Sequence, residues 1–319
     1  MRTQLPFTLL AAALTCSLFS VPAQAQRART FVASYGNDNN PCTFGSPCKT
    51  FQQAVNVVAE GGEVTAIDSA GFGPIYIAHA VTITSPAGVE ARIVPVSGGN
   101  AITIKVGETD AVVLRGLALN GSGIVSNGIV FNQGGSLTVT NCLVENFFSN
   151  GGDSTGNGIF IAPTAGNVKF AITDTTVSNN GNVGLYYLSL GGLATASGII
   201  DRLVATNNFF GIFLDTSATV GAAISNSVVS NNGSFGIELT GNGGALTVSV
   251  DNTTLNGNGT GISASQLAAV MLSRSVIQGN GVGTDNQTSN TFYTYGNNLI
   301  DRNGNNFVGG NLYSGVTLR

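Results

Sequence analysis

Short segments that alternate between apolar and polar residues follow one another from residue 63 onward, and glycine, asparagine or proline separates them. Alternation over a few residues is typical of β-strands with one buried side. We therefore expect strands at residues 30–34, 75–77, 81–83, 101–106 and 112–119. One segment has helical spacing instead. It begins after Thr50, a good N-cap residue, covers residues 51–59 and precedes Gly61 and Gly62, which favour its end.

The second half of the chain repeats every 22 to 27 residues. Asparagines mark this repeat at Asn180, Asn207, Asn232, Asn258, Asn280 and Asn303. Six residues before each of them stands a second marked position, at Asp174, Asp201, Asn226, Asn252, Arg274 and Asn297. An aliphatic residue follows three positions later, at Val177, Val204, Val229, Leu255, Ile277 and Ile300. A period this short predicts stacked supersecondary units.

Several all-β folds contain short strands, but the asparagine positions favour one of them. A propeller needs blades of about 40 residues, and a sandwich gives no reason for asparagine at a fixed phase. In a parallel β-helix, equivalent residues of successive coils stack about 4.8 Å apart, so asparagines can bond amide to amide. Asparagine also tolerates the left-handed backbone of tight corners. We expect residues 63–319 to form roughly ten coils of such a solenoid.

Glycines form another column, at Gly158, Gly184, Gly211, Gly236, Gly261 and Gly283. Most of them precede an apolar triplet whose first and third residues should face the core, because side chains alternate along a strand. The middle residues should then face outward. Phe160, Tyr186 and Phe213 hold that place in three consecutive coils. We expect them either to bind a sugar or a partner surface, or to pack under nearby loops.

Residues 31–42 (FVASYGNDNNPC) and 47–54 (PCKTFQQA) resemble the start of secreted right-handed β-helix proteins of the pectate-lyase-like superfamily. The Asn-Gly-x-x-Gly pattern at residues 180–184 and 232–236 resembles the coil repeat of that superfamily. The resemblance implies that a strand and a helix in residues 26–62 cap the N-terminal end of the solenoid. Enzymes of the superfamily act on acidic polysaccharides, but the fold alone does not fix a function.

Composition narrows the set of partners. Only 9% of the residues are charged, the net charge is −4, and no basic cluster follows the first residues, so a nucleic-acid partner is not expected. Residues 1–25 have the pattern of a signal peptide: a basic Arg2, an apolar stretch at 9–19 and a small-x-small site before Gln26. No later segment is apolar enough to span a membrane. We expect a secreted, periplasmic or extracellular protein.

The cysteines agree with an oxidising compartment. Cys16 would leave with the signal peptide, and Cys42 and Cys48 are close enough to close a small disulfide loop. Cys142 is then left over. A plain buried thiol is the favoured interpretation, and an intermolecular bridge is the alternative.

Residues suited to catalysis are few. The single histidine, His79, favours a structural or surface role and leaves no multi-histidine metal site. Asp215 and Glu238 are expected to point outward on adjacent coils, roughly 8 Å apart, a separation that suits inverting glycoside hydrolysis. The alternative interpretation is that they are two solvated acids that keep the surface soluble. Arg202 is a candidate partner for an acidic sugar.

No cofactor is expected. Asp174 and Asp201 could bind a cation such as Ca²⁺, but Arg274 in the same series interrupts a continuous site, and backbone hydrogen bonds at a turn explain these positions better. Residues 36–40 contain oxygen donors without the length or the glutamate of a Ca²⁺ loop, so a turn is expected.

Two functions remain open. The first is a non-enzymatic exported β-helix that binds a polysaccharide or surface partner, or serves as an extracellular structural element. The second is a polysaccharide lyase or glycoside hydrolase. An adhesin or toxin fragment and an ice-binding surface are weaker, the latter because Thr247, Thr253 and Thr254 do not repeat in neighbouring coils.

Overall fold

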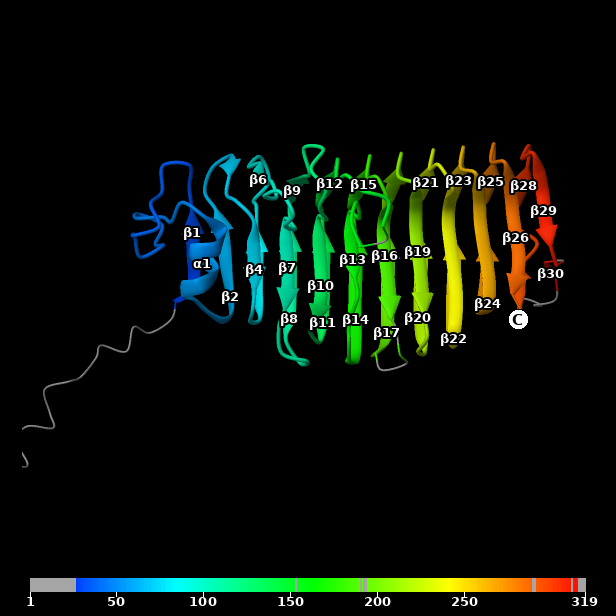
Figure 1. The fold of residues 1–319 in the computed structure, drawn as a ribbon, viewed down its shortest axis with the longest axis horizontal. Helices are drawn as coiled ribbons and strands as arrows, with labels where there is room; N and C mark the ends of the chain where they lie inside the picture. Colours follow the sequence, from blue (N-terminus) through cyan, green and yellow to red (C-terminus); the bar gives the residue numbers. More distant parts are fainter. Residues whose placement is uncertain are drawn as a thin grey trace, which may run out of the picture.

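The chain forms a right-handed parallel β-solenoid whose long axis crosses the strands (Figure 1). The computed structural model describes residues 27–152, 154–189, 191, 194–288, 291–310 and 312–314. The expected signal peptide, residues 1–25, lies outside them. Each complete coil contributes a strand to each of three faces, and every strand pair between successive coils is parallel, as in β10–β13 and β15–β18.

The strands are grouped here as faces A, B and C. Face A contains β4 (Ile75–Ile77), β7 (Ile102–Lys105), β10 (Ile129–Gln133), β13 (Ile159–Ile161), β16 (Val183–Ser189), β19 (Phe210–Thr216), the first parts of β22 (Phe235–Asp251) and β24 (Thr260–Ser273), β26 (Val282–Thr288) and β29 (Asn305–Gly309). Face B contains β2 (Val58–Ala66), β5 (Val81–Thr84), β8 (Ala111–Arg115), β11 (Ser136–Thr140), β14 (Gly166–Thr173), β17 (Ala194–Asp201), β20 (Val220–Ser225), the second parts of β22 and β24, β27 (Phe292–Thr294) and β30 (Tyr313–Ser314). Face C contains β3 (Ala70–Gly71), β6 (Ala91–Ile93), β9 (Leu117–Asn120), β12 (Leu143–Glu145), β15 (Thr176–Ser178), β18 (Val204–Thr206), β21 (Val228–Ser230), β23 (Thr254–Asn256), β25 (Val276–Gln278) and β28 (Leu299–Asp301).

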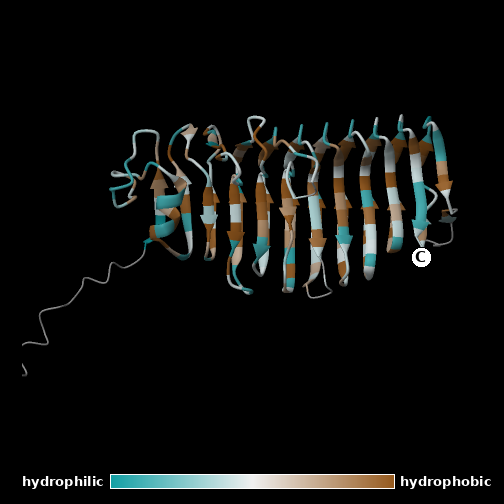
Figure 2. Cartoon of the chain, in the orientation of Figure 1, coloured by the Kyte–Doolittle hydropathy of each residue, from teal (hydrophilic) through white to brown (hydrophobic). Residues whose placement is uncertain are grey.

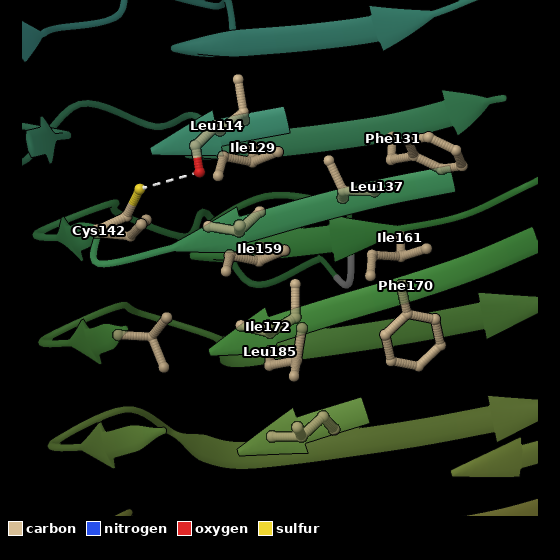
Figure 3. Packing of buried hydrophobic residues seen from close by; sticks show 14 of the residues in the cluster. Leu114, Ile129, Phe131, Leu137, Cys142, Ile159, Ile161, Phe170, Ile172 and Leu185 are labelled. Carbon is tan, nitrogen blue, oxygen red and sulfur yellow. Dashed lines mark hydrogen bonds between the residues drawn. The ribbon is translucent and has the colours of Figure 1, made fainter. Parts of the chain in front are cut away.

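Alternating burial along each strand produces one continuous core inside the coils. In β17, for example, alternate residues are buried and exposed along the whole strand, and the hydropathy colours alternate along the strands in the same way (Figure 2). Aliphatic and aromatic side chains from all three faces meet inside, among them Leu114, Ile129 and Phe131 (Figure 3). The expected strand at residues 112–119 is in fact two strands, because Gly116 has a φ of 70° and turns the chain from β8 into β9.

The asparagine ladder is present, but one of its predicted members is wrong. Asn208, not Asn207, stands between Asn180 and Asn232: the amide nitrogen of Asn180 donates to Oδ1 of Asn208, and that of Asn208 donates to Oδ1 of Asn232. The ladder continues through Asn258, Asn280 and Asn303. Asn207 is exposed and has a φ of 56°.

The same coil shifts the other two predicted columns by one residue. Arg202, not Asp201, is the left-handed corner residue equivalent to Asp174 and Asn226. Ala205, not Val204, pairs with Val177 and Val229 inside the core. The coil between Asp174 and Arg202 is 28 residues long, longer than the later ones, and the neighbouring Asn207–Asn208 and Asp201–Arg202 pairs offered two acceptable alignments.

The predicted glycine column is confirmed, and its cause is a close approach between coils. A Cβ on Gly211 would lie 2.5 Å from the carbonyl oxygen of Gly236, and one on Gly236 would lie 2.6 Å from that of Gly261. These glycines do not have a positive φ. The position thus requires glycine because no side chain fits between two stacked main chains.

The N-terminal part begins with β1 (Arg27–Val32), which pairs with β2. The helix α1 (Phe51–Val57) follows, and the Thr50 side chain accepts a hydrogen bond from the main-chain nitrogen of Gln53 as its N-cap. The helix is two residues shorter than expected because β2 already begins at Val58. Its buried residues face β1, β2 and β4, while its role as an end cap stays a prediction. A disulfide joins Cys42 to Cys48.

Cys142 is a buried free thiol at a corner position that other coils fill with hydroxyl residues. Its sulfur lies 3.4 Å from the carbonyl oxygen of Thr140 and 3.7 Å from that of Leu114 (Figure 3). Ser227 and Ser275 make the corresponding contact through their hydroxyl groups. Burial raises the pKa of the thiol to about 11, so it stays protonated at neutral pH. This agrees with the plain-thiol interpretation.

Candidate functional site

The outward side of face A contains a column of three stacked aromatic rings. The strand register pairs Phe160 with Tyr186 and Tyr186 with Phe213. The ring centroids are 5.0 Å and 4.9 Å apart, with interplanar angles of 18° and 5°. Because the rings cover one another, Tyr186 is only 4% exposed. A ligand can therefore reach the half-buried rings of Phe160 and Phe213, but neither the face nor the edge of Tyr186.

Two further rings extend this column and were missed in the sequence. Phe210 stacks on Phe213 at 5.7 Å and on Phe235 at 5.6 Å. Each of these two residues directly precedes a glycine of the glycine column, Gly211 or Gly236. That position was the available signal. The aromatic surface therefore spans four consecutive coils of face A, from β13 to β22.

Two carboxylic acids continue the aromatic surface. Glu238 pairs with Phe213 in the strand register and so takes the next place in the ring column. Asp215 is two residues after Phe213 and faces the same way. One strand step and two residues of rise separate the two acids by about 8 Å. The strand register therefore places both acids on the outward side of face A, on adjacent coils, as expected.

Burial changes the acidity of this pair. Burial, with a smaller contribution from the negative charge of Asp215, raises the pKa of Glu238 to about 7. Burial also raises the pKa of Asp215. Among the described residues, none donates a hydrogen bond to the buried Oδ1 of Asp215. Perturbed acids with an open acceptor are typical of functional positions, although structural sites also produce them.

A third acid of face A was also missed. Asp285 belongs to the same column as Glu238, with Ser263 between them. It stands two residues after Gly283, as Glu238 stands two residues after Gly236, and this spacing could have revealed it. Its Oδ1 is buried and has no hydrogen-bond partner within the described ranges, while Oδ2 accepts a bond from Gln287.

The charge of this surface is one-sided. Strands β10 to β29 of face A contain the three acids and no lysine or arginine. The candidate Arg202 is not part of the surface, because it lies at the corner between β17 on face B and β18 on face C. There its guanidinium group bonds Asp174 at 2.8 Å and also contacts Asp201. These contacts lower the pKa of Asp174 and hold Arg202 away from Asp215 and Glu238.

The other candidates have structural surroundings. In the run at residues 36–40, the main-chain nitrogens of Asn39 and Asn40 donate to the side chain and carbonyl oxygen of Asn37, as expected for a turn. Asp38 accepts hydrogen bonds from the main-chain nitrogens of Lys49 and Thr50. Asp201 accepts bonds from Ser225 and Asn226, which lower its pKa. No group of three or more histidine, cysteine, aspartate or glutamate side chains is arranged to hold a metal ion in the part of the chain that is described.

The pH dependence of stability tests the environment of Glu238. A folded-state pKa of about 7, against 4.5 for the ordinary group, means that the protonated acid stabilises the fold. This contribution is complete below pH 4.5 and is lost as the pH rises through 7, and it amounts to at most about 3 kcal/mol. We expect Glu238→Gln to abolish this loss, as measured by urea unfolding at pH 5 and pH 8. The exposed Glu108→Gln serves as control. Equal pH dependence of the wild type and Glu238→Gln would contradict the assignment.

Comparison with known proteins identifies the architecture. The family model described as "Right handed beta helix region" matches residues 104–266. None of the curated proteins matches the chain. Among solved structures, the pectate lyase Pel9A is similar with a TM-score of 0.52 and 14% identity over 90% of this chain and 81% of that one.

Two mannuronan C-5 epimerase A-modules from Azotobacter vinelandii are similar as well. The AlgE4 module has a TM-score of 0.51 and 15% identity over 71% of this chain and 72% of its own. The AlgE6 module has a TM-score of 0.51 and 14% identity over 83% of this chain and 94% of its own. At such identities the likeness concerns the fold alone. None of the helices in the described ranges is both long and apolar enough to cross a membrane.

Proposed function

We propose that this chain, which belongs to the right-handed β-helix family, is an exported protein that binds a polysaccharide along face A without cleaving it. The observation that supports this proposal is the aromatic surface on face A, with Glu238 as the next member of the ring column. It runs along the solenoid axis, the direction in which an extended polymer can meet successive coils. The disulfide between Cys42 and Cys48 supports export, since disulfides persist in oxidising compartments.

The chemistry of face A favours a polymer without negative charge. A uronate chain would bring carboxylates next to Asp215, Glu238 and Asp285, and the strands from β10 to β29 supply no lysine or arginine to balance them. Like charges at short range in a half-buried surface are unfavourable. Hydroxyl groups of a neutral sugar could instead donate hydrogen bonds to these carboxylates.

Glycoside hydrolysis is the second candidate, and the acid pair favours it. A protonated acid near neutral pH beside a second carboxylate is the arrangement that hydrolysis of a glycosidic bond requires. Glu238, with its raised pKa, would protonate the leaving oxygen. Asp215, about 8 Å from Glu238, would accept a proton from a water molecule that attacks the sugar, and this separation of the two acids leaves room for that water, as inversion requires. The substrate would again be a neutral polysaccharide, rather than the acidic one that the family resemblance implies.

Affinity gel electrophoresis with neutral and uronate polysaccharides tests the proposal. We expect a neutral polysaccharide to retard the wild type, and Phe213→Ala to weaken this binding about tenfold, because the substitution opens the ring column. Glu238→Gln, which keeps the shape of the column, should weaken binding as well. The control Phe44→Ala removes a ring that is 67% exposed in the N-terminal disulfide loop and should bind as the wild type does.

Two outcomes would contradict binding on face A: no polysaccharide retards the wild type, or Phe213→Ala is retarded equally. Thermal unfolding of each variant shows whether the fold persists. The same samples are assayed for new reducing ends. Their release by the wild type, lost in Asp215→Asn, would favour the hydrolase over the non-enzymatic function.

A further inference from the structure

Two exposed phenylalanines stand where the fold otherwise uses glycine. The residue after each ladder asparagine is a glycine in five coils, at Gly181, Gly233, Gly259, Gly281 and Gly304. Phe209 takes this place after Asn208. Phe148 takes it one coil before Gly181, since the main-chain nitrogen of the preceding Phe147 donates to Oδ1 of Asn180 at the head of the ladder. Phe148 is 55% exposed and Phe209 is 51% exposed.

The two rings differ in what they contact. Phe209 packs edge-to-face on Phe210, with centroids 4.8 Å apart, so it belongs to the aromatic surface of face A. Phe148 has no ring contact within the described residues. Its main chain is nevertheless fixed, because its nitrogen donates to the carbonyl oxygen of Ile124 and its oxygen accepts from Ser126. Phe148 is thus held at a fixed place with more than half of its surface open to a ligand.

Phe148 borders a groove of about 610 Å³ at the corner between faces C and A. Asn146, Asn179 and Asn207 lie along it at equivalent positions of three successive coils, with φ values of 62°, 55° and 56°. This left-handed backbone is one that asparagine tolerates. Within the described part of the chain, their side-chain amides make no hydrogen bond. The groove therefore presents a row of free amide donors and acceptors about 4.8 Å apart beside a bare ring.

We propose that this groove is a second carbohydrate site, distinct from face A, and that it binds neutral sugar residues. A phenyl ring offers an apolar platform to the C–H face of a sugar, and amides can both donate to and accept from its hydroxyl groups. No charged side chain is among the described residues that line the groove. A uronate, phosphate or ammonium group would lose hydration there without a compensating charge. Gly181, between the coils of Phe148 and Phe209, lines the groove without adding a side chain to it.

Titration of the full chain with neutral and charged hexasaccharides tests this proposal. The probes are β-1,4-linked hexamers of glucose and of mannose, and a galacturonate hexamer is the charged comparison. Binding is measured by isothermal titration calorimetry. We expect a neutral hexamer to bind, and Phe148→Ala to raise its Kd about tenfold. Asn179→Gly removes one amide while it keeps the left-handed backbone accessible, and it should also raise the Kd. Phe44→Ala, which removes a 67% exposed ring from the N-terminal disulfide loop, should not.

The outcomes separate the groove from face A. If Phe148→Ala and Asn179→Gly bind as the wild type does while Phe213→Ala binds more weakly, the groove proposal is overturned and the function proposed for face A stands. If Phe148→Ala and Asn179→Gly bind more weakly while Phe213→Ala binds as the wild type does, the groove proposal is supported and binding on face A is contradicted. Failure of the wild type to bind either neutral hexamer, or tighter binding of the galacturonate hexamer through Phe148, would overturn the groove proposal. Unchanged thermal unfolding of the variants, expected for exposed positions, shows that the fold is retained.

Discussion

Replacing Asn208 with alanine is expected to lower the free energy of unfolding by about 3–5 kcal/mol, among the larger effects of single substitutions. Its Oδ1 accepts hydrogen bonds from the main-chain nitrogen and the amide of Asn180, at 3.1 Å and 3.0 Å. Its own amide donates to the carbonyl oxygen of Val177 and to Oδ1 of Asn232. Alanine would leave the main-chain nitrogen of Asn180 buried without its acceptor, and the amide of Asn180 with only its bond to the carbonyl oxygen of Val144. A buried donor left unpaired costs more than the net contribution of the hydrogen bond that is lost.

The preceding residue is the matched control. Asn207 is exposed, and no side-chain hydrogen bond joins it to the described residues. Asn207→Ala should lower the free energy of unfolding by only about 1 kcal/mol, because alanine adopts a left-handed backbone less readily than asparagine does. Urea unfolding followed by circular dichroism measures both variants. Equal destabilisation by the two substitutions, or a larger effect at Asn207, would show that the ladder passes through Asn207 instead.

Gly211→Ala is expected to destabilise the fold by a similar amount, because the stacked coils leave no room for a side chain at this position. The new Cβ would lie 2.5 Å from the carbonyl oxygen of Gly236, 2.6 Å from Cγ1 of Val229 and 2.8 Å from the amide nitrogen of Asn232. The carbonyl oxygen of Gly236 belongs to the main chain of the next coil, so it cannot move aside without displacing that strand. We expect a loss of about 3 kcal/mol, at the upper end of what overpacking an interior costs.

Gly221→Ala, one strand later, provides the comparison. A Cβ on Gly221 would have no heavy atom within 4 Å, and its φ is not in the left-handed region. Alanine should therefore leave stability unchanged or raise it by about 0.5 kcal/mol, since it restricts the unfolded chain. Thermal and urea unfolding compare the stabilities of Gly211→Ala and Gly221→Ala. A Gly211→Ala protein as stable as Gly221→Ala would mean that successive coils do not approach as closely as described.

The fold was predictable because its determinants recur. The repeat, the glycine column and the apolar triplets each recur in several coils and predict the same coil structure. One irregular coil therefore did not change the predicted architecture. The errors at Asn207, Asp201 and Val204 share one cause. A one-residue difference in coil length cannot be placed where neighbouring residues are chemically interchangeable, and only main-chain pairing resolves it.

The candidate site was predictable only in part. Phe213, Asp215 and Glu238 could be assigned to one face because the side-chain period of a strand is two. The raised pKa of Glu238 depends on how much water neighbouring coils exclude, which is a property of the assembled surface. Arg202 was a candidate for binding an acidic sugar because its ion pairs could not be read from the sequence, which placed Asp174 and Asp201 at equivalent positions of two coils. They are neighbours on two coils, and together they bind the guanidinium group.

The two ends of the asparagine ladder are closed by the chain itself. At one end, Oδ1 of Asn180 accepts from the main-chain nitrogen of Phe147. At the other, both the main-chain nitrogen and the amide of Asn303 donate to Oδ1 of Asn306, three residues later, instead of pointing out of the last coil. Stacked amide columns are what allow identical chains to add to a growing fibre. Here Asn303 donates to a residue of its own coil, so its amide is not presented beyond the last coil to a second molecule.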